Sequence, residues 1–187
     1  IGETMTDIYL GGFHSSAITS EGRIFMWGLN SSGRLGDGTT TIRYTPTEIT
    51  NQFGLLVGET ITRVNLGNEH SSALTSEGNL FMWGNNSNGQ LGDGTSASKS
   101  TPTNITANFS LSAGKTIVSV SLGDSYNTAL TNEGHLFTWG LNSYGQLGEG
   151  TNPFQSDALT MEIARARSGS TPRVPAQYPP APDRRRA

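Results

Sequence analysis

Short apolar runs separated by glycine-rich polar turns recur along the chain at a constant spacing. The three tryptophans, Trp27, Trp83 and Trp139, lie 56 residues apart. Each belongs to one of three closely similar segments, residues 10–39, 66–95 and 122–151. The register holds from residue 2 to residue 152 without an insertion or a deletion. A fixed period of this kind is typical of architectures in which each repeat is one structural unit.

Within the middle repeat, three stretches have the length and pattern of β-strands. Residues 61–66 form the first, with equivalents expected near 5–10 and 117–122, and the small alternating residues 71–75 form the second. In the third stretch, 80–83, apolar residues occupy both faces, which is typical of a strand buried between neighbouring sheets.

A fourth, weaker strand is predicted after Pro46 and Pro102, in the sequences TEIT and TNIT. The stretches 51–59 and 107–115, which join the repeats, are predicted to wrap the edge of each unit as loops. Four short strands per unit without helical periodicity predict one propeller blade per repeat.

Glycine positions support a structural origin for the period. Of 24 glycines, 21 fall at seven positions that are glycine in all three copies. Gly22, Gly78 and Gly134 follow Ser-Glu or Asn-Glu between two apolar runs. This pattern favours short hairpins with glycine in the left-handed conformation.

The repeat reads Leu-Gly-x-x-His, then Ala-Leu-Thr-x-x-Gly, then Phe-x-Trp-Gly-x-Asn-x-x-Gly-Gln-Leu-Gly-x-Gly. This pattern resembles the repeat of the regulator of chromosome condensation family, and the match covers residues 2–152. The resemblance implies an all-β fold, because that family forms β-propellers, normally with seven blades. We therefore expect a partial β-propeller of three four-stranded blades, at about 2–57, 58–113 and 114–152.

Three blades cannot close a seven-bladed ring. The remaining blades of a longer propeller, or self-association, are therefore expected partners. Blades in an array stack on one another, so the middle blade has a neighbour on both sides. Trp83 is accordingly expected to be better buried than Trp27 or Trp139.

The pattern changes after residue 152. Segment 153–187 holds six of the eight prolines and six arginines against three acidic residues, a balance of +3. Such a composition, without apolar periodicity, predicts a disordered Pro/Arg-rich C-terminal tail. Residues 1–152 hold six Lys and Arg against twelve Asp and Glu, a balance of −6. An acidic body argues against a nucleic-acid surface.

Composition also limits the available chemistry. The chain has no cysteine, which excludes disulfides, thiolate metal sites and cysteine nucleophiles. Neither a membrane-spanning run nor a signal peptide is visible in the sequence, and nothing in it indicates the compartment.

Two sets of repeated polar residues could suggest catalysis or metal binding. His14, His70 and Tyr126 share one repeat position, and we interpret them as hydrogen-bonding residues at the start of the second strand. A second position carries acidic residues, interpreted as turn-capping carboxylates: Asp37, Asp93 and Glu149. We therefore expect no catalytic, metal-binding or cofactor-binding residue, and no enzyme activity.

Positions that differ between the copies are the candidates for partner binding. Between Leu-Gly and the His/Tyr position, the copies differ at Phe13, Asn68, Glu69, Asp124 and Ser125. Residues that vary in a constant frame are expected on loops, and propeller loops gather on one face. The leading hypothesis is a non-catalytic module that binds a protein partner. The family resemblance implies two alternatives, guanine-nucleotide exchange on a small GTPase and inhibition of a hydrolase.

Overall fold

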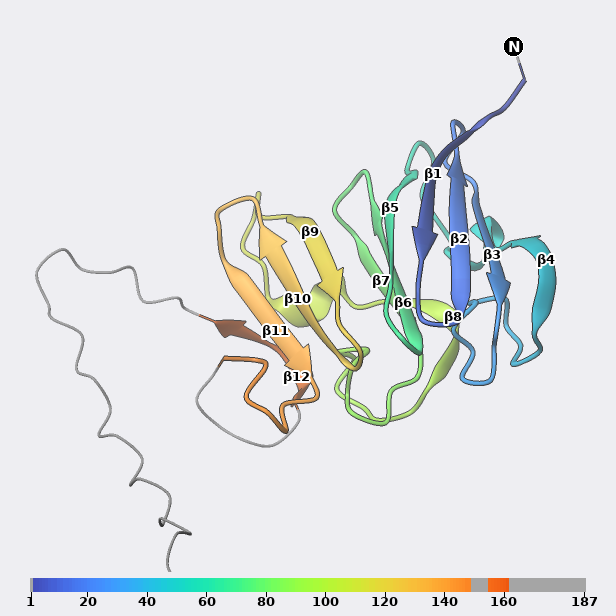
Figure 1. Ribbon diagram of the computed structural model, residues 1–187. Coiled ribbons are helices and arrows are strands. Elements are labelled where there is room, and N and C mark those ends of the chain that lie inside the picture. The colour runs from blue at the N-terminus through green and yellow to red at the C-terminus, as the bar shows by residue number, and fades with distance from the viewer. Residues whose placement is uncertain (1, 149–154, 162–187) are drawn as a thin grey trace, which may run out of the picture.

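The protein forms a row of three four-stranded antiparallel sheets, each a blade (Figure 1). A computed structural model describes residues 2–148 and 155–161. Within each blade the strands pair in sequence order, and the expected all-β partial propeller is confirmed. Blade 1 consists of β1 (Met5–Leu10), β2 (His14–Thr19), β3 (Ile24–Gly28) and β4 (Arg43–Glu48).

Blades 2 and 3 repeat this arrangement along the sequence. Blade 2 consists of β5 (Ile61–Leu66), β6 (His70–Thr75), β7 (Leu80–Gly84) and β8 (Lys99–Asn104). Blade 3 consists of β9 (Ile117–Leu122), β10 (Tyr126–Thr131), β11 (Leu136–Gly140) and β12 (Gln155–Met161). The first strand of every blade lies where the apolar pattern predicts it.

The fourth strand lies earlier than the prediction. β4 and β8 contain Pro46 and Pro102 and end at Glu48 and Asn104, so TEIT and TNIT straddle the end of the strand. These strands are the outermost of their sheets, where a residue without an N–H is tolerated on the unpaired side. The proline therefore belongs to the strand and does not precede it.

The boundary expected at residue 152 also needs correction. β12 lies in segment 153–187, for which the sequence predicts disorder, yet it pairs with β11. In this pairing Gly140 lies opposite Gln155, and in blade 2 the residues 56 positions earlier, Gly84 and Lys99, lie opposite each other in the same way. Backbone hydrogen bonds need no particular side chain, so the strand persists without the Thr-Pro of the other copies. The rest of the predicted tail, 162–187, lies outside the described residues.

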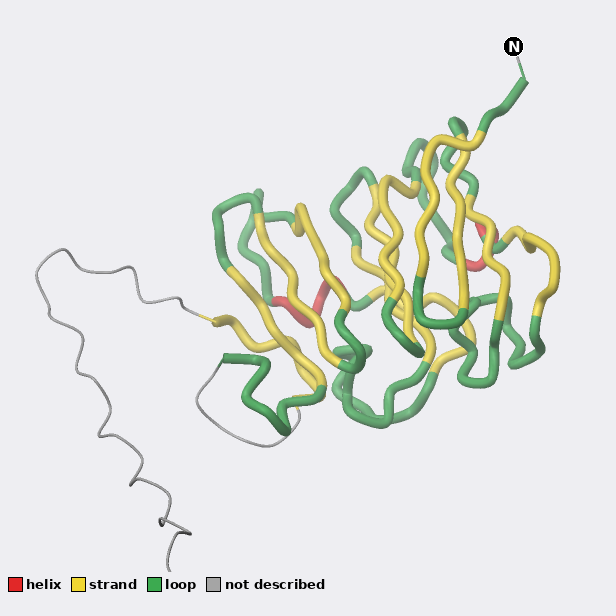
Figure 2. Tube along the Cα trace, viewed as in Figure 1, coloured by secondary structure: helices red, strands yellow, loops and turns green. Residues whose placement is uncertain are grey.

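The linkers between blades contribute to the core as well as to the edge. Each contains a short 3₁₀ turn, η1 (Thr50–Gln52) or η2 (Thr106–Phe109) (Figure 2). Phe53 and Phe109, which the sequence analysis placed in edge loops, are buried. Phe53 lies edge-to-face against Trp83, with ring centroids 5.5 Å apart.

The hydrophobic core lies between the blades, in two clusters. One joins blade 1 to blade 2 and contains Ile24, Met26 and Leu35 on one side, with Val64 and Trp83 on the other. The second joins blade 2 to blade 3 through the equivalent residues one repeat later. Blade 2 therefore buries one face against blade 1 and the other against blade 3.

Trp139 is as fully buried as Trp83, which corrects the expectation that the middle blade would be better protected. Each tryptophan points toward the preceding blade, so one neighbour is sufficient to bury it. Trp27 lies in the first of the three described blades and is only partly buried.

Candidate functional site

The repeated histidines connect neighbouring blades. Nε2 of His14 lies 2.8 Å from Oγ of Ser71, and Nε2 of His70 lies 2.6 Å from Oδ1 of Asn127. Because the amide oxygen of Asn127 only accepts, Nε2 of His70 carries the proton and donates it. The prediction of hydrogen-bonding residues at the start of the second strand is confirmed for His14 and His70.

Burial makes both histidines poor bases. Burial, together with the positive charge of Arg34, lowers the pKa of His14 to about 3. For His70, burial outweighs the hydrogen bond with Asn127 and lowers the pKa to about 4. A Cβ at Gly11 would lie 2.6 Å from Cε1 of His14, so glycine is needed where the ring meets the backbone. Both imidazoles are neutral structural groups near neutral pH.

A backbone carbonyl of the preceding blade receives two further bonds at each interface. The Arg34 carbonyl accepts from Nε1 of Trp83 at 2.9 Å and from Oγ of Ser71 at 2.8 Å. At the next interface, Nε1 of Trp139 donates to the Gln90 carbonyl at 3.0 Å. The repeated tryptophan therefore fixes one blade against the previous one.

The acidic residues of the LGDGT turns cap their own turns. Oδ1 of Asp37 accepts from the backbone N–H of Thr39 at 3.0 Å, and Oδ2 lies 2.6 Å from Nε of Arg43. Burial alone would raise the pKa of Asp37, but the hydrogen bonds from Thr39 and Arg43 outweigh it and lower the pKa. Asp93 makes the equivalent bonds with Thr95, which confirms the capping interpretation for these two residues. Glu149 lies outside the described residues.

In the described part of the chain, no group of three or more His, Cys, Asp or Glu side chains could hold a metal ion. The same residues include no helix of the length and apolar character needed to cross a membrane.

Two of the candidate partner-binding residues are held in place by Arg34. Its guanidinium is fully buried and donates through Nη1 to the carbonyl of Asn68 and through Nη2 to Oε1 of Glu69, both at 3.0 Å. The other oxygen of Glu69 accepts from Nδ2 of Asn85 at 2.8 Å. A residue of blade 1 thus orders the loop at the start of blade 2. The sequence analysis missed this role, although Arg34 departs from the Gln of the other copies.

The loops that precede the second strands of the three blades meet along one open groove of about 390 Å³. It is lined by paired positions of each blade, namely Gly11 and Gly12, Gly67 and Asn68, and Gly123 and Asp124, together with three leucines. Asp124 is exposed, whereas Asn68 and Ser125 are partly buried. Phe13 is 66% exposed at the blade 1 end. The structure thus brings two of the candidate residues, Asn68 and Asp124, to one surface and leaves Phe13, Glu69 and Ser125 outside its lining.

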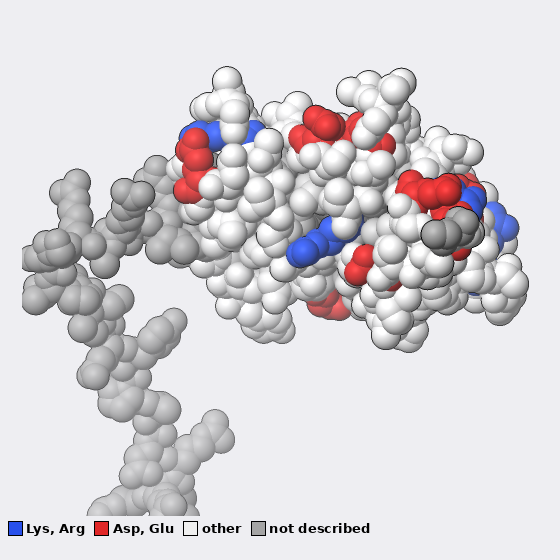
Figure 3. Space-filling view, turned by 90° about the horizontal axis from the view of Figure 1, so that it is seen from above, with Lys and Arg blue, Asp and Glu red and all other residues white. Residues whose placement is uncertain are grey.

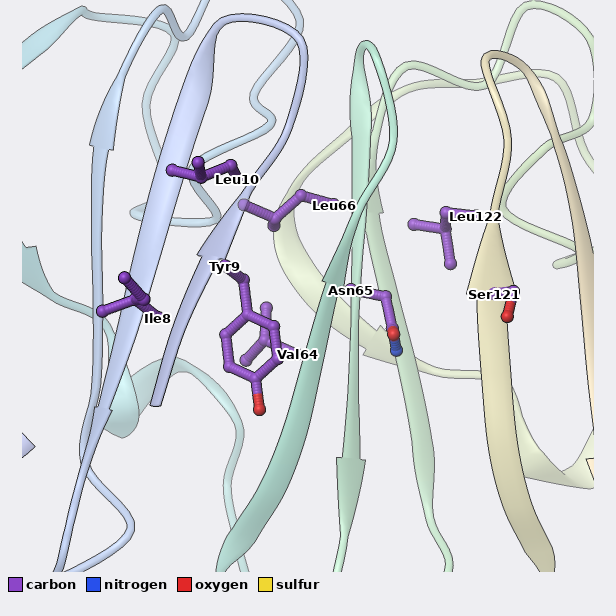
Figure 4. A pocket seen from close by; sticks show the side chains of 8 residues that line it. All are labelled: Ile8, Tyr9, Leu10, Val64, Asn65, Leu66, Ser121 and Leu122. Carbon is purple, nitrogen blue, oxygen red and sulfur yellow. The ribbon is translucent and has the colours of Figure 1, made fainter. Parts of the chain in front are cut away.

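The three leucines are Leu10, Leu66 and Leu122, the last residues of the first strands. They lie in a row on neighbouring strands and also line the adjoining depression with Tyr9 (Figure 4). Leu10 is 76% exposed, and the other two are partly buried. The sequence analysis treated them as strand residues only. A leucine constant in all three repeats and followed by glycine could have drawn attention to this row.

The opposite end of the blades carries acidic side chains, some of them paired with Arg or Lys. Its hairpin turns carry Glu21, Glu77 and Glu133, all exposed. Viewed from that end, the molecule shows acidic side chains in separate groups along the row of blades (Figure 3). One of these acids, Glu133, pairs with Lys115 at 2.9 Å. The leucine row and the glutamate row therefore lie at opposite ends of the blades.

Comparison with known proteins follows the same 56-residue period. A family model described as the regulator of chromosome condensation (RCC1) repeat matches residues 21–74, 77–130 and 133–180. A second RCC1 repeat model matches residues 5–34, 61–90 and 117–146. The chain belongs to the RCC1 repeat family.

Curated relatives carry RCC1 repeats as part of much longer chains. This RCC1-repeat chain is 34% identical over 166 residues to the human E3 ubiquitin-protein ligase HERC2, matching 85% of this chain and 3% of that protein. It is 35% identical over 164 residues to the RCC1 domain-containing protein RUG3, mitochondrial, of Arabidopsis thaliana. This match covers 84% of this chain and 35% of RUG3. The chain thus spans about a third or less of these two relatives.

Solved structures show the same fold. Yeast RCC1 (Prp20), in a structure bound to Kap60, superimposes with a TM-score of 0.71 at 23% identity, covering 83% of this chain and 37% of Prp20. A second Prp20 structure superimposes with a TM-score of 0.66 at 24% identity, covering 79% of this chain and 35% of Prp20. At this identity the likeness concerns the fold alone.

Proposed function

We propose that this chain is a non-catalytic protein-interaction module whose partner lies along the groove at the ends of the first strands. The observation that supports the proposal is the joining of loops from three blades into one open surface, beside a leucine row of which Leu10 is exposed. An open surface with exposed apolar area rimmed by polar groups is typical of a protein contact. Asp124 adds a negative charge at one end, which favours a partner segment with an apolar side chain and a basic group.

The proposal that the chain is non-catalytic rests on the burial and hydrogen bonding of its repeated histidines and carboxylates. Both described histidines at the repeat position are buried and engaged between blades, with the pKa lowered by burial. A general base needs access to a substrate and a pKa near the working pH. Described carboxylates of the LGDGT turns cap their own backbone. None of these groups is placed to act on a bound molecule.

A direct test is affinity capture with three forms of the chain. The groove variant combines Leu10→Ser and Asp124→Lys, and the control is Tyr144→Ser, since Tyr144 is 92% exposed on a turn of blade 3 outside the groove. Proteins that bind the groove are retained by the native chain and the control and are lost with the groove variant. If all three forms retain the same proteins, the groove is not the binding surface.

Guanine-nucleotide exchange is the alternative function to separate from simple binding. The second Prp20 structure is described with binding to Gsp1p and histones, and this statement concerns Prp20. A nucleotide-release assay with small GTPases distinguishes the two, because a binding module leaves the release rate unchanged. Hydrolase inhibition is tested in the same way, by adding the chain to assays of candidate hydrolases.

A further inference from the structure

The first and third blades each present one face that the fold elsewhere buries. We define the leading face of a blade as the face that packs on the preceding blade, and the trailing face as the one that packs on the next. Blade 1 and blade 3 lie at opposite ends of the row (Figure 1). The two internal interfaces show what a covered face of each kind looks like.

The leading face of blade 1 is uncovered. On the first strand, Met5 is 57% and Ile8 73% exposed, whereas their equivalents in blade 2, Ile61 and Val64, are 3% and 0% exposed. Figure 4 shows Ile8 pointing away from β5, on the side where a preceding blade would lie. The same apolar residues are thus present in both blades and differ only in what covers them.

The exposed stripe continues across the rest of blade 1. Trp27 is partly exposed where Trp83 is buried, and Pro46 is exposed where Pro102 is buried. Among the bonds of the described residues, Nε1 of Trp27 has no acceptor, whereas Nε1 of Trp83 donates to a carbonyl of the preceding blade. The leading face therefore lacks both an apolar cover and a hydrogen-bond acceptor.

The trailing face of blade 3 carries the complementary half. Leu130 is 39% exposed, whereas its equivalents Ile18 and Leu74 are 3% and 5% exposed. Leu136 is partly exposed, although the leucine at its position in blade 2 is fully buried. Gln146 stands at the position whose carbonyl accepts from the next tryptophan in the other two blades.

We propose that a second copy of this chain covers these faces, with the trailing face of one blade 3 packed on the leading face of the other blade 1. The contact continues the interface already made twice inside the chain, so it needs no new complementarity. The hydroxyl of Tyr126, at the histidine position, would approach Ser15, which stands at the position of Ser71 and Asn127. Two such contacts, related by a two-fold axis, would give a ring of six blades from two chains, one blade fewer than is usual in the family, in which every blade has two neighbours.

Two departures from the repeat make this contact weaker than the internal ones. Thr138 stands where Met26 and Met82 fill the core between blades. Position 165, one step after Phe53 and Phe109, is an arginine in the sequence. We therefore expect a reversible dimer with a mass that depends on concentration.

Sedimentation equilibrium of the full chain over a concentration series tests the proposal. The native chain is expected to approach twice its 19.9 kDa monomer mass. Ile8→Glu on the leading face and Leu130→Glu on the trailing face are each expected to raise the dissociation constant by about a hundredfold, since each buries a carboxylate in the contact. The matched control is Val118→Glu, which should dimerise like the native chain. Val118 is 45% exposed, and the residue at its position in blade 2, Thr62, is exposed as well, so this position lies outside the interface.

Mixing the two variants tests the polarity of the contact. Ile8→Glu keeps an intact trailing face and Leu130→Glu an intact leading face, so an equal mixture should recover dimer that neither variant forms alone. Circular dichroism of each variant verifies that the blades are folded. A native chain that remains monomeric throughout the series overturns the proposal and leaves the faces to blades of another chain. A Leu130→Glu variant that still dimerises also overturns it, because leading faces would then pair with each other. Leu10 stands at the position of Leu66, which packs against the core between blades 1 and 2, so Leu10→Ser also touches the leading face. The groove and the dimer contact are therefore separated with Asp124→Lys alone, because Asp124 lines the groove.

Discussion

Replacing each of the three repeated tryptophans by alanine should destabilise the protein most where the tryptophan packs against a preceding blade. Trp83→Ala and Trp139→Ala are expected to lower the free energy of unfolding by similar, large amounts, and Trp27→Ala by clearly less. Trp83 and Trp139 are each fully buried and donate to a carbonyl of the preceding blade. Trp27 is partly exposed in the single chain.

The expected magnitudes follow from this difference in burial. Replacing a fully buried aromatic ring by alanine costs about 3–5 kcal/mol, which includes the cavity that it leaves. The lost indole hydrogen bond accounts for about 1 kcal/mol of net stability. At the first interface the Arg34 carbonyl keeps its bond from Ser71 and is not left without a donor. For Trp27, about 1–2 kcal/mol is expected, because part of the ring already contacts water.

Urea unfolding followed by circular dichroism measures these losses, with similar slopes expected for all variants. The series is best made in the Ile8→Glu background, which keeps the leading face of blade 1 uncovered. Phe53→Ala provides a further control at the first interface, since its ring contacts that of Trp83 and is itself buried. If Trp139→Ala costs as little as Trp27→Ala, the preceding blade is not what buries the tryptophan and the reasoning is refuted.

Three further predictions follow from buried groups at the interfaces. The free energy of unfolding should be fully retained above pH 6.5 and fall as the pH drops toward 4, because the pKa of His70 is lowered to about 4 and the unfolded chain takes up protons first; unfolding midpoints that stay constant over this range would contradict it. Gly92→Ala should destabilise far more than Gly58→Ala, since φ is positive at both but the new Cβ would lie 2.8 Å from Nε1 of Trp139 only at Gly92; thermal melts of the pair test this. Phe109→Ala should cost about 3–5 kcal/mol in urea unfolding, as for a core aromatic; a loss below 1 kcal/mol would return the linker to a surface role.

The repeat period predicted the strands that carry side-chain patterns. The first strand of each blade and the paired apolar residues of the third are visible as alternation and as runs of apolar residues. The fourth strand was predicted less accurately because it is held by backbone pairing with β3, β7 or β11. β12 lacks the Thr-Pro of its equivalents and still keeps their register. Pairing of this kind leaves little trace in the sequence.

The candidate site shows a similar division. Variation between copies pointed to Asn68 and Asp124, which do lie in one groove with a third loop. It did not reveal the leucine row, because a residue constant in every copy resembles a core residue. It also missed that Glu69 is held by Arg34, since the two residues lie in different blades. Contacts between repeats become visible only when the blades are placed side by side.

These contacts nevertheless obey the period once one of them is known. The tryptophan bond spans 49 residues at both interfaces, and the histidine bond spans 57. Each span is the 56-residue step with a constant offset, so the bonds at one interface define those at every other. Moving the tryptophan bond back by one step leaves Trp27 as a donor, and moving it forward leaves the Gln146 carbonyl as an acceptor. A periodic sequence thus gives its end blades the same binding groups as its inner blades, and the faces left uncovered are those that fit another copy of the repeat.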